Sequence, residues 1–282
     1  MKVSTSLRAR TADIATYLAY GVICLFFAAP LLWLISLSIR TSAEVYVSDL
    51  RLWPNDPTMQ NYLSALANPL FPTYLWNGLK LSIAGALGAM LFATPAAYAL
   101  SRFRFRHHHL VMIGLLAFQM ISPLVIMVPL YRYMDRLYLT DSHFGAAMLY
   151  IAIAAPLFTW MLKGFLDGIP QSLEDAAMID GCTRFGAFMR VVLPLSLPGL
   201  TSAFVLNAIL GWSQFVIPFI LISKPALQPI AVGIFNFQGT YIDTSTQLLA
   251  AASVLSIVPA VFVFLVLQRF IIGALMAGAV KG

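Results

Sequence analysis

Acidic residues are rare in this 282-residue chain, yet three of the eleven lie in the segment LEDAAMIDG, residues 173–181. These acids are Glu174, Asp175 and Asp180. Ser172 lies just before the segment and Asp175 follows three positions later, which is the spacing of a capping box with Asp in place of the usual Glu or Gln. The pattern predicts a helix that begins at Leu173, with acids in its first turn, where the helix dipole favours negative charge. Gly181 is predicted to end this helix.

One face of the predicted helix combines small and polar residues. The spacing i, i+3, i+4 and i+7 places on it Leu173, Ala176, Ala177 and Asp180. The alanines would let another surface approach closely. A second amphipathic segment, residues 183–192, is predicted to follow the glycine turn. The pattern fits a docking helix pair, and it equally fits a well-capped loop between longer helices.

The composition restricts the class of protein. Apolar residues make up 60% of the chain, charged residues only 10%, and the mean hydropathy is +0.85. Soluble domains carry about 25% charged residues, so this surface requires lipid. The net charge of +6 does not indicate nucleic acid, because the basic residues flank apolar runs. Cys24 and Cys182 cannot form a disulfide framework and are interpreted as packing residues.

Six apolar segments are long enough to cross a bilayer, which takes roughly 20 helical residues. Backbone groups in lipid must be satisfied internally, so the prediction is an all-α membrane protein with six transmembrane helices. Prolines inside the segments are expected to kink the helices rather than break them. The first segment is too long for a secretory signal and is predicted to be retained. The segments span about 16–39, 75–100, 109–133, 143–166, 198–222 and 247–272.

Basic residues between these segments and near their ends indicate the orientation, because cytoplasmic loops carry the excess of Lys and Arg. With the N-terminus inside, the outer segments hold only six of the 17 basic residues: Arg40, Arg51, Lys80, Arg132, Arg136 and Lys224. Both termini and segment 173–181 are therefore expected to be cytoplasmic. The run SRFRFRHHH, residues 101–109, is interpreted as a membrane-interface loop and not as a metal site, because adjacent histidines on a helix point in different directions.

The longer run LEDAAMIDGCTRFGAFMRVVLPLSLPGL, residues 173–200, resembles the EAA loop of ABC importer permeases. That family pattern is Glu-Ala-Ala, two residues, Asp-Gly, and an apolar helix that ends in Leu-Pro with another Pro beyond. The matching positions are Asp175, Ala176, Ala177, Asp180, Gly181, Leu193, Pro194 and Pro198. The family has Glu where this chain has Asp175, and Glu174 lies just before it. The resemblance therefore leaves open which acid contacts a partner.

Further stretches resemble sugar-importer permeases of the carbohydrate (maltose-type) family: PLLWLISLSIRTSAEV (30–45), PNDPTMQNY (54–62), AAYALSRFRF (96–105) and GALMAGAVKG (273–282). The resemblance implies one transmembrane domain over residues 1–282, with a coupling loop at 170–192, in a bacterial cytoplasmic (inner) membrane. It also implies a non-catalytic subunit that pairs with a second six-span permease as a heterodimer. Two ATPase subunits, an external sugar-binding protein and a sugar or sugar derivative are the other implied partners, and nucleic acid is not one.

No GxxxxGK[ST] phosphate loop occurs in the sequence. The chain is therefore expected to hold no cofactor itself, with ATP and Mg²⁺ bound by the partner ATPase. By resemblance, the coupling residues are Leu173, Glu174, Asp175, Ala176, Ala177, Asp180 and Gly181, and the tail residues Val280, Lys281 and Gly282 are expected to reach the ATPase pair. No metal ligands are predicted.

Polar residues inside the apolar segments are the candidates for a substrate pathway, because they are costly in lipid. They are Asn207, Trp212, Ser213 and Gln214 in NAILGWSQFVIPF, and, more weakly, Asn77 and Gln119. An aromatic ring beside amides could stack on a sugar and bond its hydroxyls, although packing plus an interhelical hydrogen bond explains them equally well. Related sugar permeases carry Trp-Asn-acid-Phe, from which Ser213 and Gln214 depart. Gln238 and Gly239, in the last outer loop, are expected to contact the binding protein.

Other classes remain as alternatives. A permease for a non-sugar solute would differ mainly in its binding protein. A secondary transporter without an ATPase would need paired intramembrane acids or inverted repeats, and the six segments contain essentially no acid. A membrane enzyme would need a metal or nucleophile constellation, and the sequence offers none.

Overall fold

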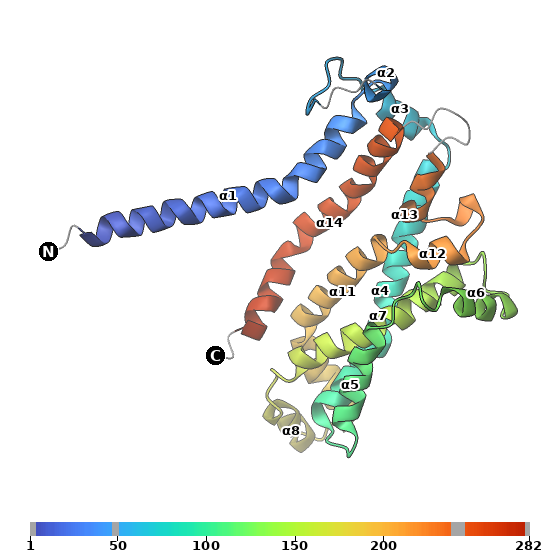
Figure 1. The fold of residues 1–282 in the computed structure, drawn as a ribbon. Coiled ribbons are helices and arrows are strands. Elements are labelled where there is room, and N and C mark those ends of the chain that lie inside the picture. Colours follow the sequence, from blue (N-terminus) through green and yellow to red (C-terminus); the bar gives the residue numbers. More distant parts are fainter. Residues whose placement is uncertain (1–3, 47–50, 238–245, 280–282) are drawn as a thin grey trace. The chain divides into compact units, whose positions relative to one another are not determined.

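The computed structural model describes residues 4–46, 51–237 and 246–279, and every regular element within these ranges is a helix. The chain forms two compact units. Unit 1 comprises Met1–Asn68 with Phe237–Leu255, and unit 2 comprises Pro69–Asn236 with Ser256–Gly282. The long helix α14 (Thr246–Ala279) contributes residues to both. Figure 1 shows the order of the elements.

Unit 1 joins a long apolar helix to two short ones. It contains α1 (Ser4–Ser38), α2 (Ser42–Tyr46), α3 (Gln60–Ala67) and the start of α14. Asn61 Nδ2 donates to the carbonyl oxygens of Ser38 and Arg40 at 2.9 and 2.8 Å. The Tyr62 hydroxyl lies 2.6 Å from the Ser38 hydroxyl. These bonds fix α3 to the chain that leaves α1.

Unit 2 is built on α4 (Phe71–Arg102), α7 (His143–Leu166) and α11 (Leu197–Trp212), which pack against one another (Figure 1). Two helices, α5 (His108–Gln119) and α6 (Met127–Arg136), connect α4 to α7. The shorter elements are α8 (Ser172–Ile179), α9 (Arg184–Ala187), a π-helical turn (Phe188–Val192), α10 (Leu193–Leu195), α12 (Val216–Leu221), a 3-10 turn (Pro225–Leu227), α13 (Ile230–Gly233) and a 3-10 turn (Ile234–Phe237).

Small residues let the three main helices of unit 2 approach closely, as is usual in membrane bundles. The buried face of α4 includes four alanines that are fully shielded from solvent: Ala86, Ala89, Ala93 and Ala97. A Cβ atom added at Gly211 would lie 3.1 Å from the Cα of Ser82, so α11 meets α4 almost backbone to backbone. Towards α8, the apolar core continues through Phe158, Leu162 and Leu166 of α7.

Four described helices are long and apolar enough to span a membrane: Asp13–Ser38, Phe71–Arg102, His143–Leu166 and Thr246–Val266. The pair Arg184–Leu195 and Leu197–Trp212, bent by 70°, makes a fifth candidate. The predicted helix at 143–166 agrees with α7 at both ends. Six spans are therefore not established by length and composition among the described residues.

The expectation that prolines kink but do not break the helices is wrong in one segment. The predicted helix 109–133 is divided, because α5 ends at Gln119 and α6 begins at Met127, with Pro123 in the turns between them. Proline lacks a backbone donor and disfavours helical geometry at the residue before it. The predicted helix 198–222 is also divided, between Trp212 and Val216. Four prolines lie in the interior of long helices that continue past them: Pro30, Pro95, Pro156 and Pro259.

Candidate functional site

The acidic segment forms the helix α8, Ser172–Ile179, which begins one residue earlier than predicted. The predicted capping box is wrong, because the residue at the N-cap is Gln171 and no side chain caps the helix. Gln171 already has helical backbone angles, φ −63° and ψ −27°. Ser172 therefore lies inside the first turn, where its hydroxyl is not in the position of a capping group.

Glu174 points into the protein, although it belongs to a short acidic helix. Its residue surface is only 4% exposed. One carboxylate oxygen accepts a hydrogen bond of 2.7 Å from the Tyr98 hydroxyl, and the other accepts from Nε of Arg102. Arg102 also donates to the carbonyl oxygen of Ile169 at 2.9 Å. A buried ion pair thus fixes α8 to the C-terminal end of α4.

Asp175, one position later, points outward. It is exposed, as are Leu173, Ala176 and Asp180, while Ala177 is half-buried. Glu174 and Asp175 therefore differ in exposure, which the sequence alone does not reveal. Two exposed apolar residues escaped the sequence analysis: Ile179, 86% exposed, and Phe185, 68% exposed. Together with Leu173 they give this outward surface an apolar component.

Gly181 ends α8, as predicted. Its φ of +91° lies in the left-handed region that favours glycine. The N–H of Cys182 donates to the carbonyl of Ala177, and the N–H of Gly181 donates to that of Met178, at 3.0 and 3.1 Å. This is the bonding of a Schellman motif. The next helix, α9, begins with a real cap, because Thr183 Oγ1 accepts from the Gly186 N–H at 3.1 Å.

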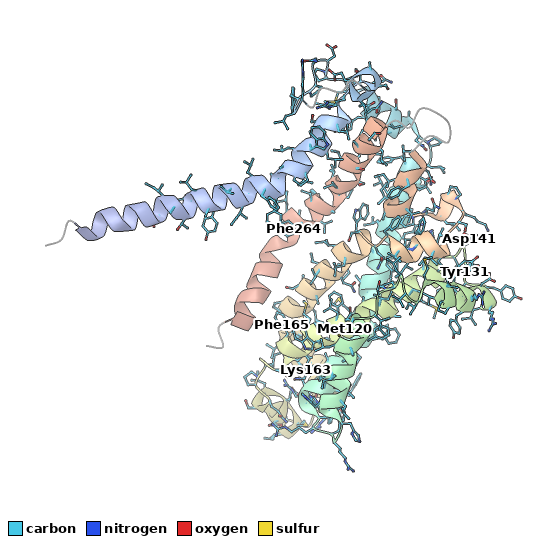
Figure 2. The ribbon with its side chains drawn as sticks, in the orientation of Figure 1. Met120, Tyr131, Asp141, Lys163, Phe165 and Phe264 are labelled. Carbon is cyan, nitrogen blue, oxygen red and sulfur yellow. The ribbon has the colours of Figure 1, made fainter. Side chains whose placement is uncertain are left out.

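A second ion pair braces the same end of unit 2. Asp167 accepts from Lys163 Nζ at 2.7 Å and from the Ser101 hydroxyl at 2.6 Å. In Figure 2, Lys163 and Phe165 lie at the end of α7 towards α8, and Asp141 lies beyond its other end. Helix α8 is therefore attached to the C-terminal end of α4, and this end is itself hydrogen-bonded to the end of α7.

A separate cavity of about 290 Å³ lies among α4, α5, α7 and α11. It gathers four of the six predicted pathway residues, namely Gln119, Asn207, Ser213 and Gln214. Ser82 and Tyr150 are polar lining residues that the sequence analysis missed, because neither stands out in an apolar helix. No Lys, Arg, His, Asp or Glu is among the residues described as lining this cavity.

Most polar groups in the cavity wall already have partners. Gln119 Nε2 donates to the Ile153 carbonyl at 2.9 Å, and Gln214 Oε1 accepts from the Val216 N–H at 3.3 Å. The Ser213 hydroxyl lies within hydrogen-bonding distance of the Ile209 and Leu210 carbonyls, at 3.3 and 3.1 Å. Asn207 differs, because its residue is 4% exposed and its Nδ2 has no hydrogen-bond partner among the described residues.

Asn77 and Trp212 are not among the residues that line this cavity. Asn77 Nδ2 donates to the carbonyl oxygens of Ala226 and Gln228 at 2.9 and 3.1 Å, which ties α4 to the loop after α12. Trp212 Nε1 donates to the Ser256 carbonyl on α14 at 3.2 Å. Both polar groups therefore make the structural hydrogen bonds that the sequence analysis kept as an alternative.

Several predictions fall on parts of the chain that the structure does not describe. Gln238 and Gly239 lie outside the described residues, and so do Val280, Lys281 and Gly282. The described part of the chain contains no group of three or more His, Cys, Asp or Glu residues that could hold a metal ion. Binding-protein contact and the role of the tail stay predictions.

A family model for the inner membrane component of binding-protein-dependent transport systems matches residues 85–275. A sulfoquinovosyl glycerol transport system permease protein from Agrobacterium fabrum is 32% identical over 94% of this chain and 93% of its own length. A maltose/maltodextrin transport system permease protein from Vibrio parahaemolyticus is 33% identical over 95% of each chain.

The fold is also similar to that of a solved structure. A crystal structure of a bacterial ABC transporter involved in the import of the acidic polysaccharide alginate has a chain with a TM-score of 0.76 to this one. The match covers 92% of this chain and 96% of that chain at 24% sequence identity, so it supports the fold alone.

Proposed function

The chain belongs to the family of inner membrane components of binding-protein-dependent transport systems, and we propose that it is a permease subunit of an ABC importer for a sugar or sugar derivative. In this function it forms half of the translocation pathway. A separate ATPase subunit supplies the energy, and an external binding protein delivers the sugar. The chain itself is a non-catalytic subunit.

The observation that carries the proposal is the pair of helices α8 and α9. Glu174 is buried against Arg102 and Tyr98, whereas Asp175 and Leu173 remain exposed on the same short helix. A loop helix without a partner has no need of a buried ion pair to hold it at a fixed angle. The arrangement suits a rigid element that transmits movement between an ATPase and the membrane helices.

The energy of coupling requires more than one charge. Changing a transporter from 1:99 to 99:1 between two states takes about 5.5 kcal/mol of differential interaction. An exposed salt bridge from Asp175 supplies roughly 0–1 kcal/mol. The apolar side chains of Leu173, Ile179 and Phe185 are therefore part of the proposed ATPase contact, with Asp175 rather than Glu174 as its acid.

Six spans and a cytoplasmic position for both termini complete the proposal. In this topology α5 and α6 together occupy the third span, and α11 with α12 the fifth. The excess of Lys and Arg in the loops on one side supports the orientation. The assembly would contain a second, different permease subunit and two ATPase subunits, in a bacterial inner membrane.

Co-purification from the native host tests this function. The tagged chain, extracted in mild detergent, should carry an ATPase and a second permease with it. The matched variant Asp175→Lys reverses one exposed charge, so it should retain the second permease and recover less ATPase than the wild-type chain. Recovery of the chain alone, with solute transport in liposomes that needs no ATP, would contradict the importer function.

A further inference from the structure

Among the described residues that line the unit 2 cavity, Asn207 has a buried side-chain amide whose nitrogen makes no hydrogen bond. It lies on α11, which packs against α4 and α7. Buried donors in folded proteins almost always have a partner, either a protein group, an ordered water or a ligand. Because Asn207 also lines the cavity, its side-chain amide is a candidate contact for something that occupies that cavity.

The lining restricts the chemistry of the occupant. Its polar members are neutral: Ser82, Gln119, Tyr150, Asn207, Ser213 and Gln214. A charged ligand group buried there would need an opposite charge or several strong donors to replace its water. None of the described lining residues supplies such a charge. An occupant with hydroxyl and ether oxygens meets no such penalty.

The apolar part of the wall and the volume fit the same occupant. Phe158 and Leu157 of α7 line the cavity beside the polar groups. Small-molecule sites are typically apolar clefts with a few placed polar groups, from about 300 Å³ upward. The cavity, at about 290 Å³, has the size of the smallest of these, which suits one sugar ring rather than a long oligosaccharide.

We infer that this cavity is a subsite for an uncharged sugar unit, and that the side-chain amide of Asn207 forms a hydrogen bond with it. The inference rests on the importer function proposed above and narrows its substrate class. The carbonyl and amide oxygens of the wall accept hydrogen bonds from the hydroxyls of the sugar. Gln119, whose nitrogen is held by the Ile153 carbonyl, presents its amide in a fixed orientation.

Transport by the whole importer tests the subsite. The chain, its second permease and the ATPases are reconstituted in liposomes. ATP is supplied on the side of the membrane where the ATPases lie, and the binding protein is supplied on the other side. Labelled neutral mono- and disaccharides, including maltose and trehalose, are compared with the corresponding uronic acids. The variants are Asn207→Ala and Asn207→Leu, and the matched control is Thr201→Val, which removes a polar atom from α11 outside the cavity.

The wild-type importer should take up a neutral sugar in preference to the uronic acids. Each Asn207 variant should lower uptake per assembled complex about twofold to tenfold, the usual effect of one lost hydrogen bond. Thr201→Val should transport normally. All three variants should still assemble with the ATPases.

Three results would overturn the inference, and they separate it from the proposed function. Normal uptake by Asn207→Leu would show that the cavity holds only water or nothing, while the importer function stands. Preference of the wild-type importer for uronic acids would refute an uncharged substrate, again without refuting an importer. Failure of the wild-type chain to assemble with an ATPase would refute the proposed function and the subsite with it.

Discussion

Glu174 and Asp175 show how much two adjacent residues of similar chemistry can differ in role. Both are acids in the first turn of a short helix, where the dipole favours either of them. The partners of Glu174 decide the difference, and they lie 76 and 72 positions earlier in the chain, at Tyr98 and Arg102. Local sequence spacing carries no information about such distant contacts. The sequence could therefore predict an acidic helix but not which acid remains exposed.

The buried ion pair gives a prediction at this scale. Glu174→Ala leaves the guanidinium of Arg102 buried without its partner, because both side chains are less than a tenth exposed. Loss of one member of a buried pair typically costs about 3–5 kcal/mol. We expect a clear fall in the thermal unfolding temperature of the detergent-purified complex.

Asp175→Ala is the matched control, because Asp175 is exposed on the same helix turn. Exposed substitutions of this kind change stability by about 0.5 kcal/mol or less. Asp175→Ala should therefore leave the unfolding temperature nearly unchanged and weaken co-purification of the ATPase. Equal losses of stability in the two variants would show that the separation of roles is wrong.

At the scale of the element, the two ends of α8 illustrate when a local pattern suffices. Gly181 could be placed correctly, because a left-handed C-terminal residue is a local requirement that glycine meets best. The capping box at the other end failed, because helical geometry already includes Gln171 and moves Ser172 into the first turn. Nothing in the spacing of Ser172 and Asp175 reveals the conformation of the residue before them.

Gly181 gives a prediction that separates conformation from bulk. A Cβ atom added there would meet no atom within 4 Å, so the cost of Gly181→Ala is conformational, about 1–2 kcal/mol. Gly181→Trp adds a large side chain in open space beside the surface proposed to meet the ATPase. We expect Gly181→Trp to uncouple ATP hydrolysis from uptake, with more ATP hydrolysed per sugar imported.

Gly181→Asn is the control for this experiment, because asparagine tolerates the left-handed region better than other residues with a Cβ atom. It should import sugar close to the wild-type rate, and Gly181→Ala should be intermediate. If Gly181→Trp imported sugar with normal coupling, the turn would have no part in contact with the ATPase.

At the scale of the whole molecule, the length of the apolar segments predicted the long helices but not the positions where two of these helices are divided. The segment 143–166 became α7 without change, whereas 109–133 was divided near Pro123. Hydropathy sums over a window and does not register where a backbone turns. The gathering of Gln119 and Asn207 at one cavity was equally beyond the sequence, since it depends on how α5, α7 and α11 pack. Composition therefore indicated a membrane bundle, and only packing located its polar cavity.

The orientation of unit 2 gives the last prediction. Tyr138, 92% exposed in the chain between α6 and α7, should lie outside the cell, and Asp175 should lie in the cytoplasm. Single cysteines are introduced as Tyr138→Cys and Asp175→Cys after the native Cys24 and Cys182 are replaced by serine. A maleimide that cannot cross the inner membrane should label Tyr138→Cys in cells whose envelope outside the inner membrane has been permeabilised. It should reach Asp175→Cys only after the inner membrane is opened. The reverse pattern would show that the excess of Lys and Arg does not set the orientation here, and it would remove α8 from the side where ATP is available.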